Sequence, residues 1–185
     1  MRIVAGKFRG KQLEAPRSDH IRPTADRIRE AVFSSIGSRI GTDFSGLYVL
    51  DLFAGTGALG LEALSRGAAH CIFVETDVEA RGLIRGHIES FGVGGQTKLM
   101  KRDATDLGPI ERVRPADLVF VDPPYDQGLG ERAIASGLQG GWIAPGALIV
   151  LEERKSAEIT PPEGVEVVDR REYADSAITF MVAPE

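Results

Sequence analysis

A glycine-rich loop in the first third of the sequence has the residue types of a nucleotide-binding turn. Residues 51–60 follow an apolar run and precede a run with helical spacing, and Gly55, Gly57 and Gly60 match the pattern G-x-G-x-x-G in this strand–loop–helix context. Glycines there permit a tight turn and let a ligand touch the backbone. Glu75 ends the next apolar run, where a carboxylate can accept hydrogen bonds from both ribose hydroxyls. The sequence therefore predicts an adenosine-type cofactor at the carboxyl ends of the strands.

An acidic residue at the mouth of this loop favours one adenosine cofactor over another. A dinucleotide such as NAD needs its pyrophosphate at the N-terminus of the helix that follows the loop. Asp51 lies four residues before the first glycine, and its carboxylate would repel a pyrophosphate. The same carboxylate could pair, directly or through water, with the ammonium group of a methionine moiety. The pattern thus favours S-adenosylmethionine.

A second motif, Asp-Pro-Pro-Tyr, follows another apolar run. Residues 118–122 predict a strand that delivers Asp122 to the same edge of the sheet as the glycine loop. Pro123 and Pro124 lack N–H groups and fix φ, so the segment is stiff, extended and unable to continue the sheet. The carbonyl of Pro123 is left to face a ligand, and Tyr125 adds an aromatic ring.

These groups suit methylation of an amino group on a nucleic-acid base. Such an amino group is a poor nucleophile because its lone pair is delocalised into the ring. The Asp122 carboxylate and the Pro123 carbonyl could each accept one N–H, which favours a pyramidal nitrogen with its lone pair directed at a methyl donor. The ring of Tyr125 would hold the base by stacking. We predict Asp122, Pro123 and Tyr125 as the catalytic residues, with Asp122 a possible proton acceptor.

Alternating strands and helices are expected to position both motifs. Apolar runs predict strands at residues 47–53, 71–75, 97–101, 118–122 and 147–152, and helical spacing predicts helices at 25–38, 58–66, 78–91 and 130–138. Thr24 and Asp77 are candidate N-caps. This alternation implies an α/β fold, with a parallel sheet covered by helices on both faces. Extended runs at 165–173 and 177–182 would add a terminal hairpin and an antiparallel edge.

Other chemically suggestive residues have weaker contexts. Asp103 could accept a hydrogen bond from the adenine amino group, or it could be a turn or cap aspartate. Cys71 and Trp142 lie in apolar surroundings and are expected in the core, and a buried Cys71 argues against cysteine-dependent methylation of pyrimidine carbon. The histidines lack the spacing of ligands, so we predict no metal site. The expected cofactor-binding residues are Asp51, Phe53, Gly55, Thr56, Gly57, Glu75, Asp103, Ala104 and Asp122.

The N-terminal segment is basic although the whole chain has a net charge of −5. Residues 1–39 contain nine Lys or Arg and four Asp or Glu, whereas residues 40–185 contain thirteen and twenty-three. This asymmetry indicates either a basic arm that meets phosphates or a solvated arginine-rich face. Residues 1–15 resemble two short strands around a glycine-containing turn, and residues 16–23 a loop. A single cysteine and the lack of a 20-residue apolar run fit a cytoplasmic protein without a membrane span.

With these motifs together, the chain resembles the RsmD-type family of bacterial small-subunit (16S) ribosomal RNA guanine-N2 methyltransferases. The resemblance covers nearly the whole chain and includes the stretches 2–13, 22–33 and 51–60, Glu75 and residues 122–125. The glycine loop and Asp-Pro-Pro-Tyr are shared by many amino-directed methyltransferases. The stretch Arg-Pro-Thr-x-Asp-Arg-x-Arg-Glu at 22–30 is far more specific.

This resemblance implies a Rossmann-like class I S-adenosylmethionine methyltransferase. Its seven-stranded sheet would be mostly parallel with an antiparallel terminal strand, and residues 1–22 would form a basic β-hairpin extension of a domain at 23–185. The implied substrate is a guanine of 16S rRNA in the assembling or assembled small subunit, modified by a monomer. The implied RNA contacts are Arg2, Lys7, Arg9, Lys11, Arg22, Arg27 and Arg29. Glu152 and Glu153 depart from an RNA-binding edge and leave the RNA footprint there open.

Three other functions remain open from the residues. DNA adenine-N6 methyltransferases also use Asp-Pro-Pro-Tyr, but such enzymes usually carry a target-recognition region for which this chain has no room. An NAD-dependent oxidoreductase would need a catalytic Tyr/Lys or His pair, and none is evident. A non-catalytic RNA-binding module would bind RNA through the same arm and leave S-adenosylmethionine unused.

Overall fold

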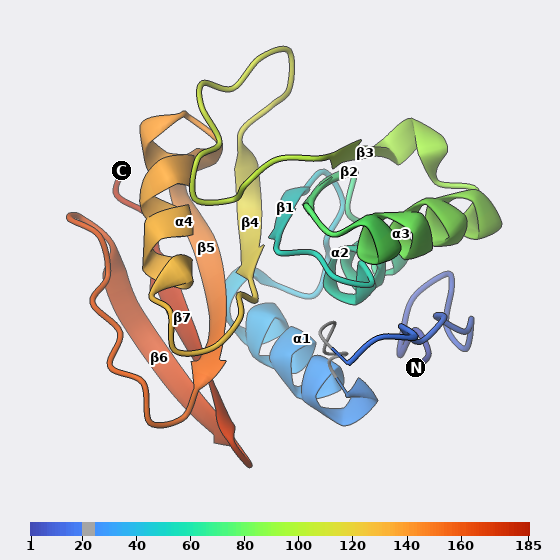
Figure 1. Cartoon of the computed structure of the whole chain (residues 1–185), viewed down its shortest axis with the longest axis horizontal. Coiled ribbons are helices and arrows are strands. Elements are labelled where there is room, and N and C mark those ends of the chain that lie inside the picture. Colours follow the sequence, from blue (N-terminus) through green and yellow to red (C-terminus); the bar gives the residue numbers. More distant parts are fainter. Residues whose placement is uncertain (20–24) are drawn as a thin grey trace.

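The computed structural model describes residues 1–19 and 25–185 and contains a sheet of seven strands flanked by helices (Figure 1). The strands are β1 (Tyr48–Leu52), β2 (His70–Val74), β3 (Thr97–Met100), β4 (Ala116–Val121), β5 (Ile143–Arg154), β6 (Glu166–Tyr173) and β7 (Ser176–Val182). Their order across the sheet is β3-β2-β1-β4-β5-β7-β6. Neighbouring strands from β3 to β5 are parallel, and β7 is antiparallel to both β5 and β6. The predicted α/β class, with its antiparallel terminal strand, is confirmed.

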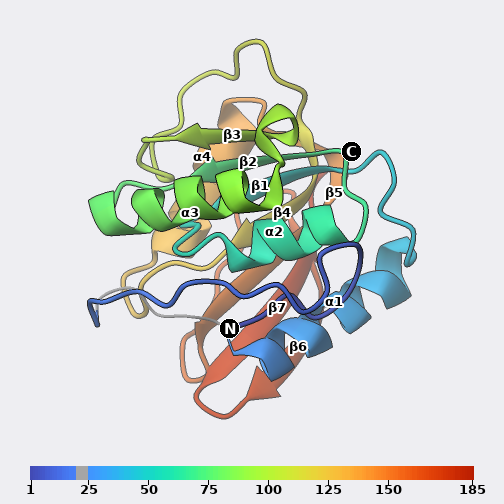
Figure 2. The same cartoon turned by 90° about the vertical axis from the view of Figure 1, so that its right-hand side faces the viewer.

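The helices lie on the two faces of the sheet, as Figure 2 also shows from the side. They are α1 (Asp26–Ile40), α2 (Ala58–Ser65), α3 (Val78–Phe91) and α4 (Leu129–Gln139), with a 3₁₀ turn at Gly94–Gln96. Phe33 of α1, Leu61 of α2 and Ile84 of α3 pack in one apolar cluster with Phe120 of β4. The neighbouring Val121 points to the other face, into a second cluster with Ala133 and Ile134 of α4, because successive side chains of a strand alternate between faces.

Local signals explain several helix boundaries. Asp77 caps α3 as predicted, since its side chain accepts a hydrogen bond from the backbone N–H of Ala80 at 2.9 Å. Gly92 ends this helix in the left-handed conformation that favours glycine. The predicted N-cap Thr24 lies outside the described residues, and Ala25, at the N-cap position, makes no side-chain capping bond. None of the helices in residues 1–19 and 25–185 is long and apolar enough to cross a bilayer.

The N-terminal hairpin has far less strand pairing than we expected. One antiparallel bridge joins Arg2 and Gln12, and no strand forms in residues 1–19. The backbone N–H groups of Val4 and Ala5 instead donate to the Glu62 carboxylate of α2, at 2.9 and 3.1 Å. The arm (residues 1–19) is therefore fastened to α2 by hydrogen bonds, while the backbone N–H groups of Ile3 and Leu13 pair across the short hairpin with the carbonyls of Lys11 and Met1, both at 2.9 Å. The predicted boundary at residue 22 lies outside the described residues.

A glycine permits the closest approach of the arm to α2. Gly6 has a φ of +87°, and a Cβ there would lie 2.0 Å from the carbonyl oxygen of Ser65. Ser65 also accepts a hydrogen bond from Lys7 N–H through this carbonyl at 2.9 Å. Any larger residue at position 6 would push the arm away from the helix.

The two residues expected in the core are there. Cys71 of β2 is fully buried, and Trp142 is 2 % exposed. The indole N–H of Trp142 donates to the carbonyl of Gly108 at 2.8 Å, which satisfies its one polar group. Both residues are thereby assigned to packing.

Candidate active site

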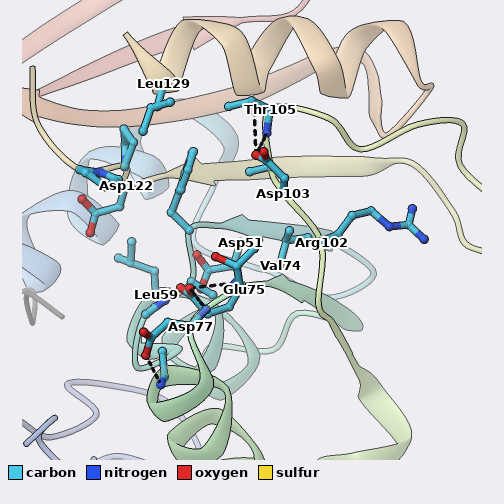
Figure 3. Close-up of a pocket in the computed structure, with 18 of the residues that line it drawn as sticks. Asp51, Leu59, Val74, Glu75, Asp77, Arg102, Asp103, Thr105, Asp122 and Leu129 are labelled. Atoms are coloured by element: carbon cyan, nitrogen blue, oxygen red, sulfur yellow. Dashed lines mark hydrogen bonds between the residues drawn. The ribbon is translucent and has the colours of Figure 1, made fainter. Parts of the chain in front are cut away.

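A cavity of about 550 Å³ opens at the carboxyl ends of β1, β2 and β4, within the roughly 300–1,000 Å³ of small-molecule sites. Figure 3 shows its wall, with Asp51 and Glu75 side by side and Asp122 apart from them beside Leu129. Eight of the nine residues predicted to bind the cofactor line it: Asp51, Phe53, Gly55, Thr56, Glu75, Asp103, Ala104 and Asp122. The ninth, Gly57, begins the helix that follows the loop.

Backbone conformation makes the glycine loop compact. Gly55 and Gly57 have φ values of +59° and +80°, in the left-handed region that glycine adopts at little cost. Phe53 has a φ of +56° without being glycine, which is a strained conformation of the kind found at ligand sites. Gly60 lets α2 approach β2, because a Cβ there would lie 2.4 Å from the Phe73 ring. Gly55 and Gly57 thus serve the turn, whereas Gly60 serves the packing of α2 on β2.

Glu75 closes the loop from the end of β2. One of its carboxylate oxygens accepts a hydrogen bond from Gly55 N–H at 2.7 Å. The other accepts from the backbone N–H groups of Thr76 and Asp77, both at 3.0 Å. Because a carboxylate has about four acceptor positions and three are used here, Glu75 can hold the loop and still accept one hydrogen bond from a ligand, not the two expected from the sequence.

Asp51 lies beneath the loop and is 1 % exposed. Its carboxylate accepts a hydrogen bond from Gly60 N–H at 3.0 Å. Burial raises the pKa of Asp51 well above its usual value, the nearby Glu75 carboxylate adds to the increase, and the Gly60 hydrogen bond opposes it. A cationic ligand group in the cavity would stabilise the charged form of both carboxylates.

Asp103 combines the two roles considered for it from the sequence. Its side chain accepts hydrogen bonds from the backbone N–H and the hydroxyl of Thr105, at 2.8 and 2.7 Å, which forms a turn. These bonds lower the pKa of Asp103 and keep it ionised, and the bond from the Thr105 hydroxyl has the larger effect. The same residue lines the cavity, next to the buried Ala104.

The Asp-Pro-Pro-Tyr segment begins where β4 ends. The register pairs Leu52 of β1 with Val121, so Asp122 follows directly beside the start of the glycine loop. Asp122, Pro123 and Pro124 line the cavity. The structure therefore brings the two motifs, about 70 residues apart in the chain, to one wall.

Tyr125 does not line this cavity with its neighbours. Its hydroxyl donates to the carboxylate of Glu152 at 3.3 Å, and the guanidinium of Arg154 lies 5.1 Å from the ring centroid. A cation over the ring takes the place that a stacked base would need on that face, which limits how stacking can occur.

Glu152 and Glu153 correct our view of the end of β5. They are 6 % and 4 % exposed, so they do not present acidic groups to an RNA surface. Glu152 contacts Tyr125, and Glu153 accepts hydrogen bonds from the backbone N–H groups of Asp126 and Arg154 at 3.3 and 2.7 Å. No sequence motif surrounds them, and in the sheet they pair with Ile178 and Ala177 of β7.

Other functional candidates were absent from our expectations. Arg102 and Arg132 bring positive charge to the cavity wall. Asp77 and the apolar side chains of Leu59 and Leu129 also line the cavity. Their only sequence signal was position just after a strand or in the first turn of a helix. In residues 1–19 and 25–185, no group of three or more His, Cys, Asp or Glu side chains is arranged to hold a metal ion.

Five of the predicted RNA contacts are exposed: Arg2, Lys7, Arg9, Lys11 and Arg27. The ammonium groups of Lys7 and Lys11 lie 5.1 and 5.5 Å from the ring centroid of Phe8, so cations and an aromatic ring share the tip of the arm. Arg22 lies outside the described residues.

The prediction that Arg29 contacts RNA is wrong. Its side chain is fully buried and forms an ion pair with Glu62 at 3.1 Å and another with Asp26 at 3.0 Å. It also donates to the backbone carbonyl of Arg2. Arg29 lies on the inner face of α1 with Val32 and Phe33, and there it joins α1, α2 and the arm.

Comparisons with known proteins show which family the chain resembles. The family model described as Conserved hypothetical protein 95 matches residues 1–182. Ribosomal RNA small subunit methyltransferase D of Escherichia coli is 38 % identical over 154 residues, which are 82 % of this chain and 74 % of that protein. Its counterpart in Haemophilus influenzae is 33 % identical over 165 residues, covering 88 % and 83 %.

A solved structure shows the same fold over the whole length. The structure of yhhF from Escherichia coli superimposes with a TM-score of 0.83 at 31 % identity, covering 100 % of this chain and 98 % of the other. The Rossmann-like fold of S-adenosylmethionine methyltransferases is thereby confirmed. Together with the match over residues 1–182, these relatives show that the chain belongs to the family described as Conserved hypothetical protein 95, the RsmD family.

Proposed function

We propose that this ribosomal RNA methyltransferase modifies the exocyclic N2 of a guanine in 16S rRNA, with S-adenosylmethionine as the methyl donor. The observation that carries the proposal is the shared wall formed by the glycine loop and Asp122-Pro123. It puts acceptors for an amino group beside a cavity suited to a nucleoside with a cationic tail. The named relatives, both called small subunit methyltransferase D, support the choice of small-subunit RNA.

The cavity has a complement for each part of the donor. Glu75 would accept from one ribose hydroxyl, Asp51 would face the methionine ammonium, and Asp103 with Ala104 would meet the adenine. The backbone of Phe53, Gly55 and Thr56 would contact the ligand closely, since Gly55 leaves it uncovered, whereas Gly57 would serve the turn behind them. When bound, S-adenosylmethionine supplies a methyl group on a positively charged sulfur.

Asp122 and Pro123 would act on the target amino group. The carboxylate of Asp122 and the carbonyl of Pro123 would each accept a hydrogen bond from one of its two N–H groups. These bonds would turn the nitrogen lone pair toward the methyl group. This is catalysis by positioning and electrostatics, without a covalent enzyme intermediate. A stacked base cannot reach this wall, so the guanine must leave its helix, and Tyr125 would stack on it.

The exposed cations of the arm and of α1 would hold the surrounding RNA. Arg2, Lys7, Arg9, Lys11 and Arg27 offer charges to phosphates, whereas the rest of the chain is acidic. We expect residues 1–22 to act as this extension of the catalytic domain at 23–185. We further expect a monomeric, cytoplasmic enzyme that acts on the assembling or assembled subunit.

Product analysis tests the proposal and separates it from adenine-N6 methylation. Small subunits from cells that lack this protein are incubated with the enzyme and labelled S-adenosylmethionine, and their nucleosides are identified by mass spectrometry. We expect N2-methylguanosine with the native enzyme and with Asp106→Ala, an exposed aspartate outside the cavity wall. Asp122→Ala should abolish the product. N6-methyladenosine, or full activity of Asp122→Ala, would refute the assignment.

A further inference from the structure

His87 is buried between the cofactor loop and the N-terminal arm. It lies on α3, is 4 % exposed and has its ring 6.3 Å from that of Phe91. Its Nδ1 lies 3.0 Å from the carbonyl oxygen of Thr56, in the glycine loop. Its Nε2 lies 2.9 Å from the backbone nitrogen of Glu14, in the arm. One imidazole thus joins two segments that are 42 residues apart in the sequence.

The partners fix the protonation state of this ring. A peptide carbonyl can only accept a hydrogen bond, so Nδ1 carries the hydrogen that is donated to Thr56. A peptide N–H can only donate, so Nε2 must be the unprotonated acceptor for Glu14. His87 is therefore neutral and in a single tautomer. Burial agrees with this, because it lowers the pKa of His87 below its usual value.

The bond to Thr56 acts on the most adaptable part of the cavity. Thr56 lies between Gly55 and Gly57, two residues whose backbone has many accessible conformations. The peptide that joins Thr56 to Gly57 is held at both ends, since Gly57 N–H donates to Ala54 at 2.8 Å. Fixing this plane orients the loop that lines the cavity.

The bond from Glu14 to His87 is one of two attachments between this part of the arm and α3. The backbone N–H groups of Arg17 and Ser18 donate to the carboxylate of Glu79, at 2.9 and 3.3 Å. Glu79 and His87 both belong to α3, so the end of the arm lies along this helix. A displacement of the arm at residue 14 must strain or break its bond to His87.

We propose that His87 is a positioning residue that couples the N-terminal arm to the glycine loop. Cofactor binding at the loop then tightens the docking of the arm, and docking of the arm orders the loop for the cofactor, because such coupling is reciprocal. This inference rests on the proposed function in one respect, that the loop receives S-adenosylmethionine. RNA bound to the arm would thereby promote cofactor binding.

Amide hydrogen exchange measures the coupling without any methyl transfer. We expect S-adenosylhomocysteine to slow exchange of the Glu14 amide in the native protein by about five-fold or more. The amide of Ala183, which donates to Ala147 in the sheet, serves as the internal control and should not change. Calorimetry in the same samples reports the affinity for S-adenosylhomocysteine.

Two substitutions separate the two bonds of the ring. In His87→Asn the amide nitrogen replaces Nδ1 and keeps the bond to Thr56, whereas in His87→Gln the amide oxygen replaces Nε2 and keeps the bond to Glu14. His87→Asn should bind S-adenosylhomocysteine within about two-fold of the native protein, and His87→Gln should bind up to about ten-fold more weakly, the effect of one neutral hydrogen bond. In both variants the ligand should no longer slow exchange at Glu14.

Each outcome decides the matter. An effect of the ligand on Glu14 that persists in both variants, or none in the native protein that binds it, overturns the coupling while leaving the proposed function intact. Absence of binding to the native protein overturns the proposed function together with the coupling. The native exchange measurement stands even if one variant fails to fold.

Discussion

The carboxylate of Asp51 accepts a hydrogen bond from the backbone N–H of Gly60 across 3.0 Å, and it does so while 1 % exposed. This bond connects the end of β1 to the first turn of α2, around the glycine loop. Asp51 therefore has a structural partner in addition to the ligand group that we assign to it. Its pKa is raised because one hydrogen bond from an N–H group does not compensate for the loss of hydration of the buried carboxylate.

The affinity for cofactor should rise with pH through the titration of Asp51. A methionine ammonium pairs with the carboxylate only when Asp51 is deprotonated, and burial raises the pKa of this residue well above 3.8. The free energy of unfolding depends on pH in the opposite direction. The contribution of Asp51 to it is fully present below the pKa of Asp51 in the unfolded chain and is lost as pH rises through its pKa in the folded protein. Calorimetry with S-adenosylhomocysteine from about pH 5 to about pH 8 measures the affinity.

Asp51→Asn is the matched variant for this prediction. The variant should bind S-adenosylhomocysteine more weakly than the native protein once Asp51 is ionised, because the amide carries no charge. Its affinity should also lack the increase with pH that the ionisation of Asp51 causes in the native protein. A native affinity that is flat with pH would contradict the role of Asp51 as the partner of the ammonium.

Tyr125 should act through its ring more than through its hydroxyl. Tyr125→Phe loses one long hydrogen bond to Glu152, so we expect an increase in KM for the RNA of no more than about five-fold. Tyr125→Ala also loses stacking worth roughly 1–3 kcal/mol and should lower kcat/KM by about ten-fold or more. Steady-state kinetics on small subunits compare the two. The affinity for S-adenosylhomocysteine should stay unchanged in both, and equal effects of the two substitutions would argue against stacking.

Removal of Arg29 should destabilise the fold. Arg29→Met leaves the buried Glu62 without one of its ion-pair partners and Arg2 without a donor, which should lower the free energy of unfolding by about 3–5 kcal/mol. Arg27→Met, on the exposed side of the same helix, should change it by less than about 0.5 kcal/mol. Urea denaturation measures both. Equal stability of the two variants would show that the buried ion pair contributes nothing.

Charge reversal on the arm and on α1 should weaken RNA binding. Arg9→Glu with Arg27→Glu should lower affinity for small-subunit RNA and reduce the slope of log affinity against log salt by up to about two, because each phosphate contact contributes close to one. Arg114→Glu is the control, since Arg114 is exposed near the opposite end of β4. Binding is followed by filter retention at several salt concentrations. An unchanged slope would show that neither Arg9 of the arm nor Arg27 of α1 contacts RNA phosphates.

The contiguous motifs of this protein could be predicted from the amino-acid sequence alone. The glycine loop, Glu75 and Asp-Pro-Pro-Tyr each follow a strand, and parallel strands end at one edge, so their meeting could be foreseen. The alternation of apolar runs likewise predicted the layers of the sheet, and Asp77 the start of α3. These features depend on interactions within about ten residues of the chain.

The burial of particular charged and polar side chains depends on how distant segments fold together, and it could not be predicted from local patterns. Arg29 and Arg27 are both arginines of one helix, yet the first pairs with Glu62, 33 residues away, and the second is exposed. Val4 and Ala5 of the arm have their acceptor in Glu62 of α2, and His87 has its two partners because arm and loop both meet α3. The partner of a buried polar group is set by chain segments that fold onto it from far away, and no local spacing encodes that choice.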